Sequence, residues 1–363
     1  MARRTAMVRW AWLALLGLPS CSTLADSGGG DVGLPNAGAG PFREIESLEL
    51  GNNRSAPNVL KDDDLYPRHL SVVDADGDLG TLDSWGYAAL TLVPEGAEPD
   101  PTASSNGIGR YRAPDGRSFE RQHELVLEPT LPWEGDEMGA PSALVVGDEI
   151  RLYYAAAGGI GLATSSDGLH FERRDEPVLG PAPDGWEQGA TPQSPSVVAH
   201  PSGGFRLFYE VRSPSGEASL GEAVSADGVL FERRGAGPVL APRPPGPEPL
   251  FDDRSVEAPH GLYHPSAEGR MILWLYYGAV DQSGGRSIAV AARRGDDEPL
   301  VRGTAPVFGT ASSDDPSEPW VIRYGGFALL FATQRAGSTE SQNYPAVAAG
   351  VAPATAVLPP PVD

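Results

Sequence analysis

The chain has 363 residues, of which 40% are hydrophobic, and this is enough for a large core in one or two domains. Its 45 glycines and 36 prolines make turns frequent and disfavour long helices. The formal net charge of −22 repels phosphate backbones and anionic lipid head groups. The composition therefore excludes nucleic acid as a partner and favours neutral ligands or cations.

The first 20 residues have the order of a secretory signal peptide, with Arg3, Arg4 and Arg9 ahead of the apolar run "WAWLALLGL". That run is too short to span a membrane. The following "LPSC" resembles the lipobox of bacterial lipoproteins, in which the cysteine, here Cys21, is lipidated and becomes the new N-terminus. Cys21 is the only cysteine, and lipidation would explain a lone thiol in an exported protein. The alternative is an ordinary signal peptide with an incidental cysteine.

Residues 21–41 combine the lipidated cysteine with small, flexible residues, and we interpret them as a tether between lipid and domain. Residues 42–355 carry the strand-like segments described below, and residues 356–363 form a proline-rich tail. We therefore predict an exported lipoprotein, anchored on the periplasmic side of the outer membrane or on the cell surface. We expect it to be a monomer.

One short motif occurs three times along the chain. It reads "PDGRSFERQHELVL" at 114–127, "SSDGLHFERRDEPVL" at 165–179 and "ADGVLFERRGAGPVL" at 226–240. Asp-Gly between strand-like runs is a strong signal for a tight hairpin turn. We interpret the repeat as structural: the turn sets the strand register, and the phenylalanine packs between sheets.

Two further strand-like runs precede each hairpin, such as "PSALVV" and "IRLYYAAA" in the second copy. A period of about 40–70 residues with four short strands per unit is typical of radial blades. The sequence therefore predicts an all-β protein, a five-bladed β-propeller of four-stranded antiparallel blades, at about 62–130, 131–181, 182–242, 243–309 and 310–355. The last hairpin is degenerate, so we expect a strand from "FREIESLEL" (42–50) to complete the fifth blade.

The segments that enter the blades share a second pattern, an aromatic residue and an acid eight or nine positions before a proline. It begins at Trp133, Trp186 and Phe251. Together with "IGLATSSDGLHF", "GFRLFYEVR" and the "EAP" that starts at Glu257, these segments resemble the five-bladed propeller glycosidases over about 290 residues. That group includes the arabinanases, xylosidases, invertases, levansucrases and related phosphorylases of glycoside hydrolase families 43, 32 and 130.

The resemblance implies glycoside hydrolysis by two carboxyl groups about 5–10 Å apart, with a third acid that tunes the first. By this resemblance Glu257 is the candidate acid, and Asp64, with its neighbours Asp62 and Asp63, is the candidate base. Glu137, at the entry of the second blade, is the candidate tuning group.

The candidate substrate-binding residues are Trp133 and Trp186, whose flat faces suit sugar rings, and Gln193, Arg254 and His260, which could bind hydroxyl groups. The alternative for both tryptophans is packing between blades. The histidines are too scattered for a metal site. No cofactor is required, although the resemblance allows a structural calcium ion.

Two functions remain open from the sequence. The first is a cell-envelope glycoside hydrolase that acts on carbohydrate. The second is a non-catalytic propeller that binds saccharide or a protein partner. The absence of the Asp-Pro pair from the first blade favours the second, whereas the blade sequences and Glu257 favour the first.

Overall fold

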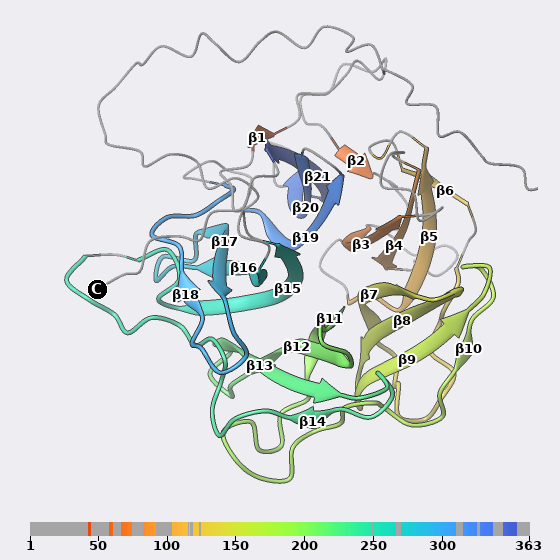
Figure 1. The fold of residues 1–363 in the computed structure, drawn as a ribbon, viewed down its shortest axis with the longest axis horizontal. Coiled ribbons are helices and arrows are strands. Elements are labelled where there is room, and N and C mark those ends of the chain that lie inside the picture. The colour runs from red at the N-terminus through yellow and green to blue at the C-terminus, as the bar shows by residue number, and fades with distance from the viewer. Residues whose placement is uncertain are drawn as a thin grey trace, which may run out of the picture. The chain divides into compact units, whose positions relative to one another are not determined.

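The computed structural model describes residues 43–44, 58–60, 67–74, 83–91, 104–114, 116, 119–122, 125–248, 250–265, 270–309, 315–324, 327–336 and 344–353. They form five antiparallel sheets that follow one another around a common centre (Figure 1). None of these residues belongs to a helix that could cross a membrane. Residues 1–42, which include Cys21, lie outside this set, as do Asp62, Asp63 and Asp64.

Four of the sheets have four strands each, paired in chain order. The first two sheets contain β3 (Arg68–Asp74), β4 (Ser84–Leu90), β5 (Gly107–Ala113) and β6 (Glu120–Arg121), then β7 (Met138–Val146), β8 (Glu149–Ala156), β9 (Gly159–Ser165) and β10 (Glu172–Arg173). The next two contain β11 (Gln193–Ala199), β12 (Phe205–Arg212), β13 (Ala218–Ser225) and β14 (Glu232–Arg233), then β15 (Ser255–Pro265), β16 (Met271–Val280), β17 (Arg286–Arg293) and β18 (Val301–Arg302).

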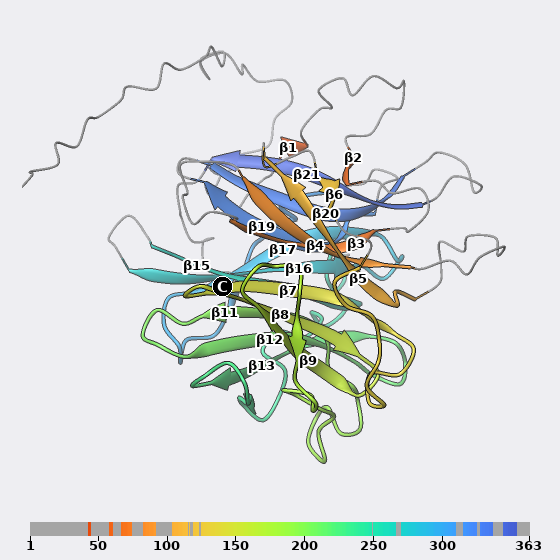
Figure 2. The same cartoon turned by 90° about the vertical axis from the view of Figure 1, so that its right-hand side faces the viewer.

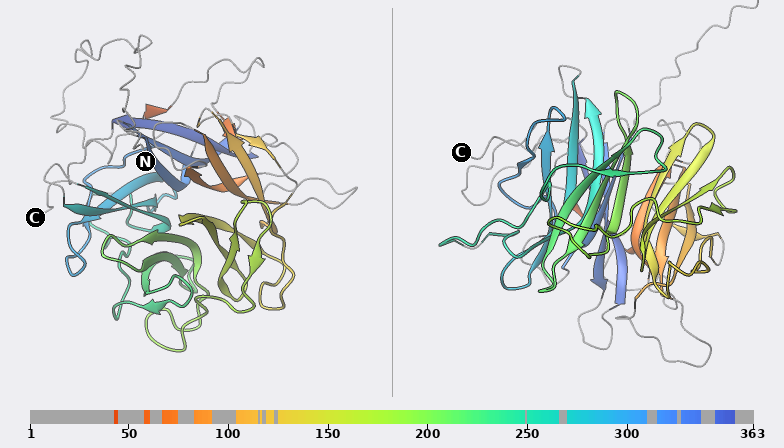
Figure 3. Two further views of the ribbon diagram at one scale, coloured as in Figure 1. Left: turned by 45° about the vertical axis from the view of Figure 1, so that its right-hand side comes forward. Right: turned by 90° about the horizontal axis from the view of Figure 1, so that it is seen from below.

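The fifth sheet joins the two ends of the propeller. It consists of β19 (Ser317–Tyr324), β20 (Phe327–Ala336) and β21 (Tyr344–Pro353), with β1 (Arg43–Glu44) and β2 (Asn58–Leu60) both paired to β21 (Figure 2). The predicted strand from 42–50 is therefore present as β1, in register with Val351 and Gly350. The view turned by 45° shows the same circular order of sheets, and the predicted β-propeller of antiparallel sheets is confirmed (Figure 3). Four sheets have the predicted four strands, and the sheet that closes the ring has five.

The core consists of apolar clusters at the seams between neighbouring sheets. Five such clusters each combine residues of two adjacent blades, including the pair formed by the first and fifth blades. One sheet alone could not cover both of its faces. Burial at the seams is thus what requires the ring to close.

The threefold sequence motif accounts for the outermost part of three blades. Its Glu-Arg pair is the two-residue outer strand, as in β10 and β14. Its phenylalanine packs edge-to-face on an aromatic residue of the preceding blade, with centroids 5.7 Å apart for Phe171 and Tyr87 and 6.0 Å for Phe231 and Tyr153. This agrees with the structural interpretation of the repeat.

The glycine of each turn is required by geometry. Gly168 and Gly228 have φ of +70° and +78°, and a Cβ on Gly228 would lie 2.8 Å from the Tyr153 hydroxyl. That hydroxyl donates a 2.8 Å hydrogen bond to the Gly228 carbonyl, so the turn of the third blade is tied to the second. A side chain at this position would therefore strain both the turn and the seam.

The innermost strands carry a bulge at the same place in every blade. At each bulge a non-glycine residue has positive φ; these residues are His69, Ala140, Ser194, Ala258 and Glu318. A bulge re-aims the side chains around it. All five of these residues line one cavity on the axis, with a volume of about 20 Å³.

A ring of hydrogen bonds connects the five innermost strands just beyond the bulges. In each blade, the side chain two residues after the bulge bonds to the backbone of the next blade. The pairs are Ser71 with Ala143, Ser142 with Val197, Ser196 with Gly261, His260 with Val321 and Trp320 with Val72, at 2.8–3.0 Å. The ring holds the bulge residues at fixed positions around the axis.

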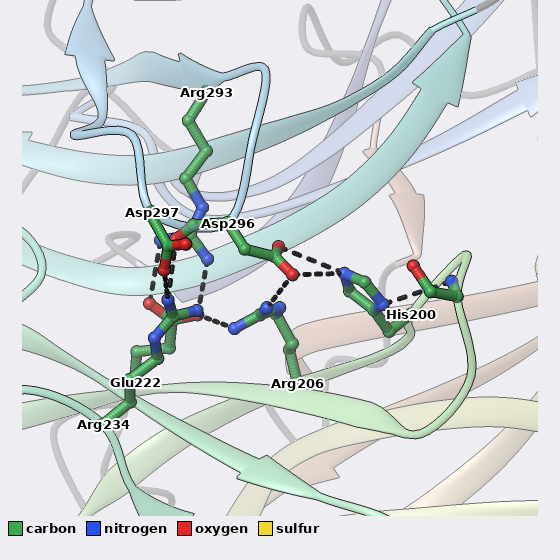
Figure 4. Close-up of polar contacts among 8 residues, drawn as sticks. His200, Arg206, Glu222, Arg234, Arg293, Asp296 and Asp297 are labelled. Carbon is green, nitrogen blue, oxygen red and sulfur yellow. Dashed lines mark hydrogen bonds and ion pairs between the residues drawn. The ribbon is translucent and has the colours of Figure 1, made fainter.

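A network of charged residues crosses the seam between the third and fourth blades (Figure 4). Its centre is Glu222 on β13, a buried carboxylate that contacts Arg206 at 2.6 Å and Arg293 at 2.5 Å. Asp296, in the β17–β18 connection, bonds to Arg206 and to His200. Because Arg206 lies near the start of β12, this network is at the opposite end of the blades from Arg212 and the groups described next.

Candidate functional site

Glu257 lies on the innermost strand of the fourth blade, directly before the bulge residue Ala258. Its side chain is 8% exposed and contacts two arginines. Oε2 accepts a 2.6 Å hydrogen bond from Arg286, at the start of β17, and Oε1 lies 3.4 Å from Nη1 of Arg212, at the end of β12. The predicted catalytic residue thus directly precedes a residue that lines the axial cavity, and two guanidinium groups lie beside it.

A second carboxyl group, Glu210, belongs to the same cluster. Arg212 Nε lies 2.7 Å from Glu210 Oε1, so one guanidinium contacts both Glu210 and Glu257. Carboxyl groups that share one guanidinium are within about 10 Å of each other, inside the range that glycosidases use. Two carboxyl groups therefore lie in one cluster, but Glu210 was not predicted, and the predicted base Asp64 lies outside the described residues.

The third and fourth groups come from the fifth and first blades. Glu318 Oε2 accepts a 3.1 Å hydrogen bond from the backbone N–H of His69 and lies 3.3 Å from its Nδ1. Both residues line the axial cavity, and both have the positive φ of the bulge. The cavity itself has room for about one water molecule, which is too small for a sugar ring.

The pKa values of two members of the cluster are shifted in opposite directions. Burial raises the pKa of Glu210, and the charges of Glu257 and Glu318 raise it further, while Arg212 and the Ala258 N–H lower it. Burial lowers the pKa of His69, against the opposing effect of Glu318, so this imidazole is neutral at neutral pH. Groups with pKa values moved in different ways are what acid–base chemistry at a single pH requires.

Three predicted residues are solvent-exposed at the entries of the blades. Glu137 is exposed ahead of β7, Gln193 is exposed at the start of β11, and Arg254 is exposed immediately before β15. Gln193 is the third-blade counterpart of Glu257, since each directly precedes a bulge residue. None of the three bonds to the Glu257 cluster among the described residues.

Trp133 and Trp186 lie in the packing between elements. Trp133 donates a 2.8 Å hydrogen bond from Nε1 to the Asp175 carbonyl and stacks on Tyr154, with ring centroids 6.1 Å apart. Trp186 is half-buried in the seam between the second and third blades. These positions fit the packing alternative for both residues.

The acid that follows each aromatic residue in the entry pattern is buried inside its blade. A tyrosine hydroxyl of the second strand and an arginine of the outermost strand contact it. The three sets are Glu134 with Tyr154 and Arg173, Glu187 with Tyr209 and Arg233, and Asp252 with Tyr277 and Arg302. The entry pattern therefore marks a repeated internal clamp, and its arginine is the one in the outermost strand.

His260 is buried in the ring of interblade hydrogen bonds. Its Nε2 lies 2.9 Å from the Val321 carbonyl, so this nitrogen must carry the hydrogen. Burial lowers the pKa of His260 to about 4, because the charged imidazolium has no carboxylate in contact with it among the described residues. The hydrogen bond to the next blade therefore explains why a histidine is buried at this position.

A bound metal ion finds little support in the donors present. No group of three or more His, Cys, Asp or Glu side chains suitable for a metal occurs in the part of the chain that the structure describes. At the mouth, two arginines already contact the carboxylates Glu210 and Glu257, which removes the excess negative charge that calcium needs.

Comparison with known proteins gives likeness of structure alone. No family profile matches the sequence, and no curated protein does. A thermostable family-43 glycoside hydrolase is similar over 80% of this chain and 89% of its own, at 15% identity and a TM-score of 0.58. A β-1,2-mannobiose phosphorylase from Listeria innocua, solved with β-1,2-mannobiose, is similar over 81% and 92%, at 13% identity and 0.57.

A third structure is a family-43 β-xylosidase/α-arabinofuranosidase from a compost microbial metagenome, solved with xylotriose in a calcium-free form. It matches 86% of this chain and 95% of its own, at 16% identity and a TM-score of 0.56. The chain therefore has the fold of the glycosidase propellers, as the sequence resemblance predicted. At such low identity the likeness establishes the fold and leaves the activity to the site.

Sequence reasoning missed most of the cluster around Glu257. Glu210 and Arg212 belong to a second strand and Arg286 to a third strand, whereas the candidate acids were expected at the ends of first strands. The sequence did contain a signal for Glu318, because a proline follows it directly, as Pro259 follows Ala258. His69 had none, since Leu70 stands where the other four blades have proline.

Proposed function

We propose that this protein acts on a glycoside at the axial mouth of its propeller, with Glu257 as the carboxylate that meets the substrate. The observation that carries the proposal is the sharing of Arg212 by Glu257 and Glu210. Glu318 is close enough for its charge to act on Glu210, and Glu257 is close enough for its charge to act on His69. Four polar groups from four elements converge where the inner strands meet.

Glycoside cleavage needs two carboxyl groups on either side of the scissile bond. In this proposal Glu257 is one of them, and the second is the predicted base Asp64, which lies outside the described residues. Saccharides are neutral and rich in hydroxyl groups, and the exposed N–H donors of Arg212 and Arg286 can bind them. The side chains of these arginines are 42% and 35% exposed. The xylotriose and mannobiose complexes of structurally similar proteins support carbohydrate as the ligand class.

One observation favours the second candidate function, a saccharide-binding protein without catalysis. Glu257 contacts two guanidinium groups and its side chain is only 8% exposed, so little of the carboxylate is free to meet a glycosidic oxygen. A carboxylate held in this way suits binding to hydroxyl groups. The two candidates therefore share the ligand and differ in the fate of the glycosidic bond.

The location of the protein is part of the proposal. The N-terminal segment and its single Cys21 support export, followed by lipid anchoring at the cell envelope. A tethered propeller at that place would meet extracellular or periplasmic polysaccharide. Labelling with a radioactive or alkyne fatty acid, compared between the wild type and Cys21→Ala, tests the anchor.

The test of function is a hydrolysis screen of the full chain with aryl glycosides and with plant and microbial oligosaccharides. Glu257→Gln should lower kcat by about 100-fold or more, as expected for a lost acid–base group. The matched control is Glu232→Gln, an exposed acid on β14. Cleavage that survives in Glu257→Gln refutes its role. Saccharide binding without cleavage in the wild type supports the second candidate.

A further inference from the structure

Glu210 is a buried carboxylate with no direct access to the mouth. It lies on the second strand of its blade and is 3% exposed. Both of its oxygens are engaged: Oε1 lies 2.7 Å from Arg212 Nε, and Oε2 accepts a 2.9 Å hydrogen bond from the backbone N–H of Ala258. One side chain thus connects Arg212 to the bulge of the neighbouring blade.

The fold does not require an acid at this position. In the other four blades, the residue paired with the one before the bulge is Ala89, Ala155, Gly278 or Thr333. A small side chain therefore satisfies the packing at this position in every blade except the third. Burying a carboxylate is unfavourable unless it is fully paired, so the exception in the third blade needs a reason.

Arg212 supplies that reason. It is the residue that touches both acids, and its side chain is 42% exposed. A long, exposed arginine samples many rotamers when nothing restrains it. The contact at Nε restrains the guanidinium, and its Nη1 then lies 3.4 Å from Glu257 Oε1 and 3.3 Å from the Gly216 carbonyl.

The geometry points to Glu210 as a positioning residue that holds the Arg212 guanidinium against Glu257, and thereby sets the charge around the carboxylate that meets the substrate. Its effect on the substrate is carried entirely by Arg212. The inference rests on the proposed function for its catalytic consequence, whereas the placement of Arg212 is a property of the protein alone.

Glu210→Gln is the discriminating change. Glutamine keeps the size of the side chain but places an NH2 donor where one carboxylate oxygen stood, so it cannot accept at both positions, from Arg212 at one and from Ala258 at the other. Crystal structures of the full chain and of Glu210→Gln should show that the guanidinium has left Glu257 in the variant. An Arg212 that keeps its contact with Glu257 in Glu210→Gln overturns the inference, whether or not the protein is an enzyme.

The kinetic readout is a double-mutant cycle. Glu210→Gln and Arg212→Gln should each lower kcat by roughly 10- to 100-fold, the range seen when a reacting group is misplaced. The double variant should lose no more than Arg212→Gln alone, because Glu210 acts through Arg212. Losses that multiply would show a separate role for Glu210 and refute the inference.

The control for both readouts is Glu232→Gln, which should leave the Arg212 placement and kcat as in the wild type. A wild type that neither cleaves nor binds any saccharide would refute the proposed function. In that case the displacement of Arg212 in Glu210→Gln still decides the inference.

Discussion

Replacing Glu222 by glutamine should destabilise the protein strongly through the seam between the third and fourth blades. The carboxylate is buried and contacts Arg206, Arg293 and, at 3.7 Å, Arg234. In the variant Arg206 keeps Asp296, but Arg293 keeps no carboxylate among the described residues. Glu222→Gln therefore leaves a buried guanidinium without a counter-charge.

The expected loss is about 3–5 kcal/mol in the free energy of unfolding, the range for removing one partner of a buried ion pair. The lower end applies because Arg206 remains paired. The assay is urea denaturation of the wild type and Glu222→Gln at pH 7, with tryptophan fluorescence as the signal. A matching decrease in Tm of several degrees should appear in a thermal scan.

The matched control is Asp297→Asn, which removes another partner of Arg234 at a fully exposed position and should leave the urea midpoint unchanged. Adding Arg293→Met to Glu222→Gln should recover part of the loss, because the unpaired guanidinium is removed. The reasoning is refuted if Glu222→Gln is as stable as Asp297→Asn, or if the added Arg293→Met makes it less stable still.

Three further predictions concern the blade architecture. Gly228→Ala should lower the free energy of unfolding by about 1–3 kcal/mol more than Gly147→Ala. Both glycines have positive φ, but only Gly228 has atoms within contact distance of an added Cβ. Equal urea midpoints for the two variants would contradict this. Tyr209→Phe should lower the free energy of unfolding by about 1–3 kcal/mol, because the buried Glu187 loses a 2.9 Å hydrogen bond. A change near zero would show that this hydrogen bond does not stabilise the blade. Burial lowers the pKa of His260 from 6.5 to about 4. The contribution of the neutral imidazole to the stability of the fold is therefore complete above pH 6.5 and is lost as the pH falls towards 4. The free energy of unfolding of His260→Gln should depend less on pH across this window than that of the wild type.

Local sequence rules were sufficient for the blades. An Asp-Gly turn, a phenylalanine and a Glu-Arg pair recur because every blade needs a tight turn, a ring in the seam and a short outer strand. Each of these requirements concerns residues that are close in sequence, so the same short pattern recurs from blade to blade. The closing strand β1 was predictable for a related reason, because an incomplete last unit requires a partner from elsewhere in the chain.

The entry pattern shows where such local reasoning falls short. An aromatic residue and an acid before a proline could indicate a sugar-binding mouth, and Trp133 and Trp186 were candidates on that basis. The structure uses Glu134 and Glu187 as buried partners of tyrosine and arginine instead. Sequence spacing is the same for a buried and an exposed carboxylate, and only packing distinguishes them.

The sequence by itself thus determined the number of blades, their turns and the place of Glu257 on an innermost strand. The tertiary structure decided which groups surround Glu257. Arg212 and Arg286 reach it from two different blades, and the bulges turn His69 and Glu318 towards the axis. The physical reason is that the blades form through contacts close in sequence, whereas contacts of the site such as Arg212 with Glu257 and His69 with Glu318 join residues 45 and 249 positions apart, which meet only after the ring has closed.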